Sequence, residues 1–324
     1  MSWGRACAVF AIGLVVVVTL VAGGFRLAAA WREVATVDAI APSSGRYVPT
    51  RSGRMFIQEA GPANGIPVIL FHGTAAWSEF WRKTLNALGA AGFRAIAIDL
   101  PPFGFSDRPV DNSYNRAAQA ARVREVLDRL GLERVIVVGH SFGAGAAVET
   151  VLHDLERVRG VVLIDAALGL TVAAPSDPKP PFYLKPRWLR QTLVSLTVTN
   201  PLMTRRLLSM MVAKQDHVDE YAEIVQRPLV RVGTTRDVAT WLLYFMAHDG
   251  DAVSADRTAY AKMPRTAILW GDKDTVTPLD QAEDLRRLIP GATLTVLPGL
   301  GHIPQMEDPD ALNKVLIERL RAFN

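Results

Sequence analysis

Three residues of this 324-residue chain have the types needed for acyl transfer through a covalent intermediate: Ser141, Asp274 and His302. A serine hydroxyl is a weak nucleophile until an imidazole removes its proton, and a carboxylate holds that imidazole in the right tautomer and stabilises its charged form. Ser141 is the centre of Gly-His-Ser-Phe-Gly, residues 139–143. The residue types therefore predict Ser141 as nucleophile, His302 as general base and then general acid, and Asp274 as the carboxylate that orients His302.

The residues around Ser141 predict a strand, a tight turn and a helix. The apolar residues 135–138 precede the motif, and the small residues 144–148 follow it. A serine at the apex of such a turn has strained backbone angles, and glycines two residues to either side allow close approach of neighbouring segments. The positive end of the following helix favours negative charge on a bound oxygen. The pattern is typical of a nucleophile elbow.

Two backbone amides should bind the oxygen that becomes negative during acyl transfer. Phe142 directly follows the nucleophile, and Thr74 lies in the loop after the apolar residues 68–71. One such donor contributes roughly 3 kcal/mol of transition-state stabilisation. We predict that Thr74 and Phe142 form the oxyanion hole. His72 and His140 flank this region, and we expect them to bond the backbone around the turns rather than transfer protons.

From about residue 46 to its end, the chain resembles α/β-hydrolase fold enzymes of the serine-nucleophile, lid-bearing kind. These include esterases, lipases, cofactor-free haloperoxidases and carbon-carbon bond hydrolases. The resemblance rests on five segments, residues 71–73, 99–109, 139–143, 271–274 and 301–309. It implies a mostly parallel, eight-stranded, doubly wound sheet with an inserted helical lid, and no metal or cofactor. Pro102 stands where the family usually has glycine, so we expect a different path for that loop.

The order serine, acid, histidine along the chain is the one this fold uses. The family places the acid fourth in Gly-x-x-Asp, which is Asp274. Asp272 lies two residues earlier, and Asp165 ends the apolar residues 161–164, a position from which some relatives supply the acid. Both remain alternative acids.

The alternation of strands and helices is interrupted between about residues 170 and 262. This division predicts four parts: 1–30 as a membrane anchor or signal sequence, 46–170 as the first part of the hydrolase core, 171–262 as a helical lid, and 263–324 as the second part of the core. Elsewhere we expect strands at 54–60, 67–71 and 94–98 and helices at 76–90 and 117–130. In the lid, the methionine-rich residues 201–212 predict either an amphipathic helix packed on the core or an apolar cover over the pocket.

The N-terminus carries a second functional signal. Residues 6–25 contain no charge and are long enough to cross a bilayer, and Arg5 and Arg26 bracket them. A secretory signal with cleavage at the alanines 28–30 is the rival, but its apolar core is normally shorter. We therefore favour an uncleaved single-pass anchor, with secretion after cleavage, or a buried helix, as alternatives. The apolar segment has Arg5 on one flank and Arg26 and Arg32 on the other. These counts differ too little to decide which side of the membrane carries the catalytic body.

The resemblance implies hydrolysis of a carboxylic ester, or another acyl bond, of a small apolar substrate through an acyl-enzyme on Ser141. A cofactor-free haloperoxidase or perhydrolase would use the same residues. A carbon-carbon bond hydrolase is less favoured, because those relatives commonly carry tryptophan where this chain has Ile303. Epoxide hydrolases and haloalkane dehalogenases need a carboxylate in place of Ser141. A tethered binding protein that has lost turnover is the non-enzymatic alternative.

Composition sets the remaining limits on function. The net charge is +4, without a run of lysine or arginine, so we expect no nucleic-acid partner. An anionic membrane surface beside the anchor is the partner that the basic residues would fit. The only cysteine is Cys7, so the body has neither a disulfide nor a thiol nucleophile.

Overall fold

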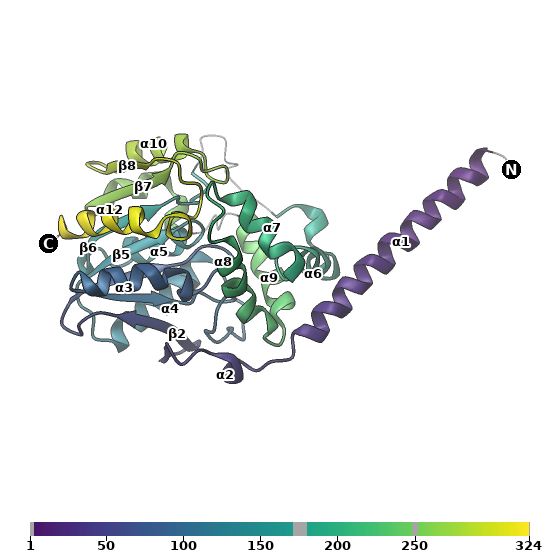
Figure 1. The fold of residues 1–324 in the computed structure, drawn as a ribbon, viewed down its shortest axis with the longest axis horizontal. Coiled ribbons are helices and arrows are strands. Elements are labelled where there is room, and N and C mark those ends of the chain that lie inside the picture. The colour runs from purple at the N-terminus through teal and green to yellow at the C-terminus, as the bar shows by residue number, and fades with distance from the viewer. Residues whose placement is uncertain (1–2, 171–179, 248–251, 324) are drawn as a thin grey trace.

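A computed structural model describes residues 3–170, 180–247 and 252–323. Its centre is an eight-stranded sheet in the order β1-β2-β4-β3-β5-β6-β7-β8 (Figure 1). The strands are β1 Arg46–Thr50, β2 Gly53–Ala60, β3 Ile66–Phe71, β4 Phe93–Ile98, β5 Val135–His140, β6 Val158–Ile164, β7 Thr266–Gly271 and β8 Thr293–Leu297. The pairs β1–β2 and β2–β4 are antiparallel, and the remaining pairs are parallel. The predicted mostly parallel sheet is confirmed.

Both faces of the sheet are covered, which explains why the central strands read as continuous apolar runs. Alternate side chains of β5 go to opposite faces, so Val135 and Val137 join one core while Ile136 and Val138 join the other. The first core is covered by α4 Arg116–Arg129, α5 Gly143–Leu152 and α10 Leu279–Leu288, and the second by α3 Arg82–Ala90 and α12 Pro309–Arg321.

The predicted helix over 76–90 begins later than expected. Trp77 has an extended backbone, a short 3-10 turn follows at η1 Ser78–Trp81, and α3 starts only at Arg82. The cause is a distant carboxylate, because Asp99 Oδ1 accepts the Ser78 amide at 2.7 Å and holds the chain in the extended entry. The other four predicted elements named above agree with the structure within one residue at either end.

Helices are inserted between β6 and β7, as the sequence predicts. Among the described residues of this insertion, the α-helices are α6 Arg187–Leu196, α7 Pro201–Met211, α8 Val218–Gln226 and α9 Thr234–Met246. Short 3-10 turns accompany them: η3 Phe182–Leu184, η4 Arg227–Val230, η5 Val253–Ala255 and η6 Arg257–Lys262. Figure 1 shows α6 to α9, hereafter the inserted helices, between the sheet and the N-terminal helix. The proline-rich start of the predicted lid, 171–179, and residues 248–251 lie outside the described residues.

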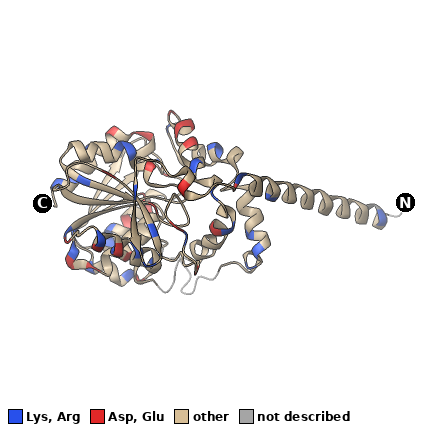
Figure 2. Ribbon diagram, turned by 90° about the horizontal axis from the view of Figure 1, so that it is seen from below, with Lys and Arg blue, Asp and Glu red and all other residues tan. Residues whose placement is uncertain are grey.

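The N-terminal helix α1, Trp3–Arg32, projects from the body as a single rod (Figure 1). Its most apolar 18-residue window has a mean hydropathy of 2.7, and no part of that window is buried against the protein. Figure 2 shows the helix uncharged along most of its length. A short helix, α2 Val37–Ile40, then leads to β1. The helix is long and apolar enough to cross a membrane, a test that both anchors and signal sequences pass.

Candidate active site

Ser141 stands at the apex of the turn between β5 and α5. Its φ is +51°, in the left-handed region that side chains other than glycine rarely adopt. A Cβ on Gly139 would lie 2.7 Å from the Ala144 Cα, and a Cβ on Gly143 would lie 2.2 Å from the His72 carbonyl oxygen. Both glycines are therefore required because neighbouring backbone passes too close for any side chain. The turn has the strained geometry expected of a nucleophile elbow.

The structure brings the three predicted residues into one hydrogen-bonded chain. The Ser141 Oγ lies 2.7 Å from the His302 Nε2, and the His302 Nδ1 lies 2.8 Å from the Asp274 Oδ2. Because a carboxylate only accepts, Nδ1 carries the proton and Nε2 is free to accept the Ser141 hydroxyl. The three side chains come from turns that follow β5, β7 and β8. Ser141 keeps 7% of its surface exposed. Such a chain can activate a hydroxyl for attack on a carbonyl carbon.

Asp274 is held as a carboxylate by a set of donors. Its Oδ1 accepts the amides of Val276 at 2.7 Å and Thr277 at 2.9 Å, and its Oδ2 accepts the Thr277 hydroxyl at 2.6 Å. Burial alone would raise the pKa of Asp274, but the hydrogen bonds and charge of His302 and the hydrogen bonds of Thr277 outweigh it and keep that pKa below its usual value. No sequence pattern indicated Thr277.

The two alternative acids face other partners. Asp272 accepts the Gly299 amide at 2.6 Å. Asp165 accepts the Gly271 amide at 2.8 Å at the end of β7, and burial, reinforced by the charge of Asp274, raises the pKa of Asp165 well above its usual value. Within the described part of the chain, neither carboxyl bonds to His302. Of the three candidates, Asp274 alone has the geometry of the orienting acid among these residues.

The loop after β3 passes directly beside Ser141. A Cβ on Gly73 would lie 3.0 Å from the Ser141 Cβ. Among the described residues, neither the Thr74 nor the Phe142 amide donates to another protein group, and Phe142 stands at the N-terminus of α5. Both amides are thus free to bind an oxygen held at Ser141. The left-handed backbone of Ala75, with a φ of +58°, was not predicted.

His72 and His140 form hydrogen bonds with backbone groups around the turns, as expected. His72 accepts the Leu100 amide at Nε2 and donates from Nδ1 to the Gly73 carbonyl, both at 2.8 Å, and burial lowers the pKa of His72 to about 4. His140 donates from Nε2 to the His302 carbonyl at 2.8 Å, and burial followed by the nearby His302 lowers the pKa of His140 to about 3. Both rings are neutral and position the site's backbone.

The inserted helices bond directly to the turn that carries His302, a contact the sequence did not predict. The His302 amide donates to the Met211 carbonyl at the end of α7, at 2.9 Å. Glu307 accepts the Gly301 amide at 2.9 Å and the Ala213 amide at 2.8 Å. One carboxylate therefore joins the histidine turn to the end of α7. Glu307 was part of the family pattern, but nothing in the sequence near it indicated these partners.

An aromatic cluster of Phe103, Phe142, Trp241 and Phe245 lies next to Ser141. Phe142 is 5.0 Å from Trp241 and 5.7 Å from Phe245 between ring centroids, and Phe103 is 4.9 Å from Trp241. The ring of Phe103 reaches this cluster from the loop that contains Pro102, whose peptide bond with Pro101 is cis. The cluster surrounds Phe142, the residue after Ser141, with apolar side chains.

The methionine-rich segment forms α7, and the two methionines at the end of this helix differ in their exposure to solvent. Met210 is 66% exposed, whereas Met211 is partly buried against a separate core that contains Ile303 and Phe80. This arrangement fits the expectation of an amphipathic helix packed on the core rather than that of a methionine cover over the pocket. In the described residues, no group of three or more His, Cys, Asp or Glu could hold a metal ion.

Comparison with known proteins identifies the family to which this site belongs. A family model described as "alpha/beta hydrolase fold" matches residues 66–309. The chain belongs to the α/β-hydrolase fold family. This α/β-hydrolase is 30% identical over 274 residues to 2-hydroxymuconate semialdehyde hydrolase of Pseudomonas sp. (strain CF600), covering 82% of this chain and 90% of that protein.

Solved structures share the fold of this α/β-hydrolase. A meta-cleavage product hydrolase from Pseudomonas fluorescens IP01 is 26% identical with a TM-score of 0.71, covering 86% of this chain and 98% of that chain. A bacterial membrane phospholipase A is 23% identical with a TM-score of 0.70, covering 97% of this chain and 98% of that chain, and shows the fold alone. With hydrolases among its relatives, the chain is an enzyme, which argues against the tethered binding protein.

Proposed function

We propose that this α/β-hydrolase is a membrane-anchored serine hydrolase that cleaves a carboxylic ester, or another acyl bond, of an apolar substrate. The observation that carries the proposal is the chain from Ser141 Oγ through His302 to Asp274, with links of 2.7 and 2.8 Å. The Ser141 hydroxyl and the ionised Asp274 supply the nucleophile and the charge that this chemistry needs.

The reaction follows from these positions. His302 Nε2 takes the Ser141 proton as Oγ attacks the carbonyl carbon, and the resulting oxyanion binds the amides of Thr74 and Phe142. His302 then gives its proton to the leaving alcohol, and the acyl group stays on Ser141. Water attacks this ester with His302 again as base, which releases the acid and restores the hydroxyl.

Aromatic side chains support an apolar substrate. Phe142 follows Ser141 directly, and its partners Trp241 and Phe245 come from α9. Val194 of α6 joins the same cluster. The inserted helices are thus the proposed lid, because they supply most residues of the apolar cluster that contains Phe142.

Contacts of the last part of α1 support an uncleaved anchor. Arg26 donates to the Gln191 side chain at 2.7 Å, Arg32 donates to the Thr199 carbonyl at 3.0 Å, and Ala29 is only 1% exposed. Cleavage after residue 30 would remove both Arg26, with its bond to Gln191, and the buried Ala29. The intact mass of protein isolated from the membrane fraction tests this proposal: a full-length mass supports the anchor, and loss of about the first 30 residues would mean a signal sequence.

A carbon-carbon bond hydrolase is the second candidate, because the relative from Pseudomonas is named 2-hydroxymuconate semialdehyde hydrolase. Ile303 after His302 argues against it. Steady-state kinetics on p-nitrophenyl esters of graded length and on 2-hydroxymuconate semialdehyde separate the two. A higher kcat/KM for the esters, lost in Ser141→Ala, supports the proposed function. A higher value for the semialdehyde would replace it with the second candidate, and peroxide-dependent halogenation would indicate a haloperoxidase.

A further inference from the structure

We propose that the start of the inserted helices is a second membrane contact, which enters the interface of the leaflet next to α1. This interfacial segment comprises Phe182, Tyr183, Lys185, Arg187 and Trp188. The inference goes beyond the proposed function and rests on one part of it, the membrane anchor. Its occupant is a lipid bilayer with anionic headgroups.

The segment exposes large aromatic side chains, whose contact with water is unfavourable. Phe182 is 80% exposed, Trp188 69% and Tyr183 52%. Phe182 and Tyr183 also contact each other edge to face, with ring centroids 5.8 Å apart. Adjacent exposed aromatic side chains mark interaction sites on soluble surfaces, and tryptophan and tyrosine are enriched where a bilayer meets water.

The backbone that presents these rings is held in place. Leu184 is buried, and the buried guanidinium of Arg190 donates to the carbonyls of Leu184 at 2.6 Å and Lys185 at 2.5 Å. The same guanidinium donates to the Ala239 carbonyl on α9 at 3.1 Å. The exposed aromatic rings therefore project from a fixed turn that is bonded to the inserted helices.

Two hydrogen bonds fix the direction of α6 relative to α1, which pack against each other. Arg26 bonds to Gln191. Arg32 comes six residues after Arg26, and it bonds to Thr199, which comes eight residues after Gln191. Both helices therefore run the same way, away from the uncharged residues 6–25. The first turn of α6 consequently points back toward the uncharged part of α1.

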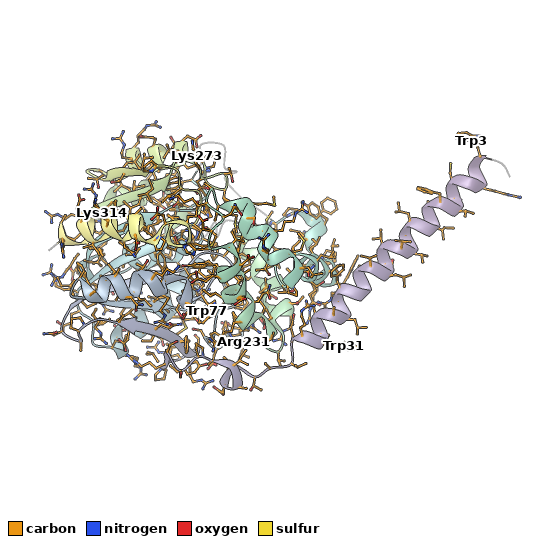
Figure 3. The ribbon with its side chains drawn as sticks, in the orientation of Figure 1. Trp3, Trp31, Trp77, Arg231, Lys273 and Lys314 are labelled. Carbon is orange, nitrogen blue, oxygen red and sulfur yellow. The ribbon has the colours of Figure 1, made fainter. Side chains whose placement is uncertain are left out.

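The helical rise places the segment at the border of that uncharged stretch. Trp188 precedes Gln191 by three residues, which is about 5 Å along a helix. Because Arg26 bonds to Gln191, Trp188 lies about one helical turn nearer to the uncharged stretch of α1 than Gln191 does. If residues 6–25 lie in the hydrocarbon, Trp188 lies at its edge. Trp31, labelled in Figure 3 at the foot of α1, is 76% exposed and lies on the headgroup side of Arg26.

The charge at this level fits an anionic surface. Neither α1 nor residues 180–200 contain an acidic residue, whereas Arg26, Lys185 and Arg187 are basic. Each basic residue near an anionic leaflet adds to the electrostatic attraction. Aromatic rings flanked by basic side chains, beside a bilayer-spanning helix, are the composition expected of an interfacial contact.

Depth-dependent quenching tests the proposal on the full chain. Cys7→Ser removes the only cysteine. Single cysteines are then introduced as Phe182→Cys, Trp188→Cys, Val15→Cys and Glu318→Cys. Each is labelled with an environment-sensitive dye, and the protein is reconstituted in vesicles of equal parts phosphatidylcholine and phosphatidylglycerol. Position 318, which is exposed on α12 at the side of the body away from α1 (Figure 1), is the aqueous control, and position 15 reports insertion of α1.

We expect brominated lipids to quench the dyes at 182 and 188 severalfold more than the dye at 318, and the emission of these two dyes to be shifted to the blue relative to that of the dye at 318. Quenching at 182 and 188 by aqueous iodide alone, equal to that at 318, would overturn the proposal. The dye at 15 then separates the causes: quenching there by brominated lipid would keep the anchor and reject only the interfacial segment, whereas its absence would reject the anchor as well.

Discussion

At the scale of single residues, the site depends on which carboxylate faces His302. Asp274 bonds to the His302 Nδ1 at 2.8 Å, whereas Asp165 bonds to the Gly271 amide. The pKa values of the two carboxyls also shift in opposite directions, that of Asp274 down and that of Asp165 up. The family pattern in the sequence favoured Asp274. It could not supply Thr277, whose hydroxyl bond to Asp274 arises from the local turn rather than from a motif.

Exchanging each carboxylate for an amide tests this division of roles. Asp274→Asn should lower kcat about 10⁴-fold, because the amide favours the wrong tautomer of His302. Asp165→Asn is the matched control and should lower kcat far less, since asparagine retains the oxygen that accepts the Gly271 amide and Asp165 does not bond to His302. Kinetics on one p-nitrophenyl ester check both. A loss in Asp165→Asn as large as that in Asp274→Asn would contradict the assignment.

At the scale of elements, the predicted strands fall within one residue of those in the structure because apolar runs and turn residues are local signals. The start of α3 was wrong by six residues, since Asp99 determines it from a different strand end. The contact between α7 and the His302 turn was also not predicted. It joins residues about 90 positions apart, and no local pattern carries such a contact.

Glu307 is the residue that holds this contact between elements. Its two oxygens accept amides from Gly301, Ile303, Ala213 and Lys214. Glu307→Gln replaces one oxygen with a donor that faces amide N–H groups, so we expect a loss of about 1–3 kcal/mol in the free energy of unfolding and a lower kcat. Urea unfolding of the full chain in detergent and ester kinetics measure these effects.

The exposed Glu318 offers the control for this variant, with 68% of its side chain accessible. Glu318→Gln should change the free energy of unfolding by less than about 0.5 kcal/mol. Equal effects of the two substitutions would mean that the bonds to Glu307 do not hold the turn.

At the scale of the whole molecule, the sequence predicted a hydrolase core, an inserted helical part and an apolar N-terminal helix, because each has its own compositional pattern. It could not predict how α1 meets the body. That arrangement depends on Arg26, Arg32 and Glu33, which bond to Gln191, Thr199 and Thr235 of the inserted region. Long polar side chains on a surface helix have no periodic signal that identifies their partners.

Global stability should depend on pH through the buried imidazoles. His72 is neutral in the folded protein because burial lowers its pKa from 6.5 to about 4. The unfolded chain therefore binds a proton that the folded protein does not over this range, and stability is lost as pH falls below about 6.5. Relative to His72→Gln, wild type should lose about 1.4 kcal/mol per pH unit between pH 6.5 and 4. Comparing the two proteins cancels the titration of groups that they share.

Urea unfolding of the full chain in detergent, at several pH values, checks this expectation. A constant difference in the free energy of unfolding between wild type and His72→Gln across that range would show that His72 takes up its proton normally in the fold.

The most direct test of the proposed chemistry is the intact mass of the full chain in detergent after treatment with a fluorophosphonate probe. A serine activated by His302 should form one covalent adduct in wild type, and Ser141→Ala, with the same circular dichroism spectrum, should form none. An adduct that persists in Ser141→Ala, or no adduct on folded wild type, would contradict the account of Ser141 as the nucleophile.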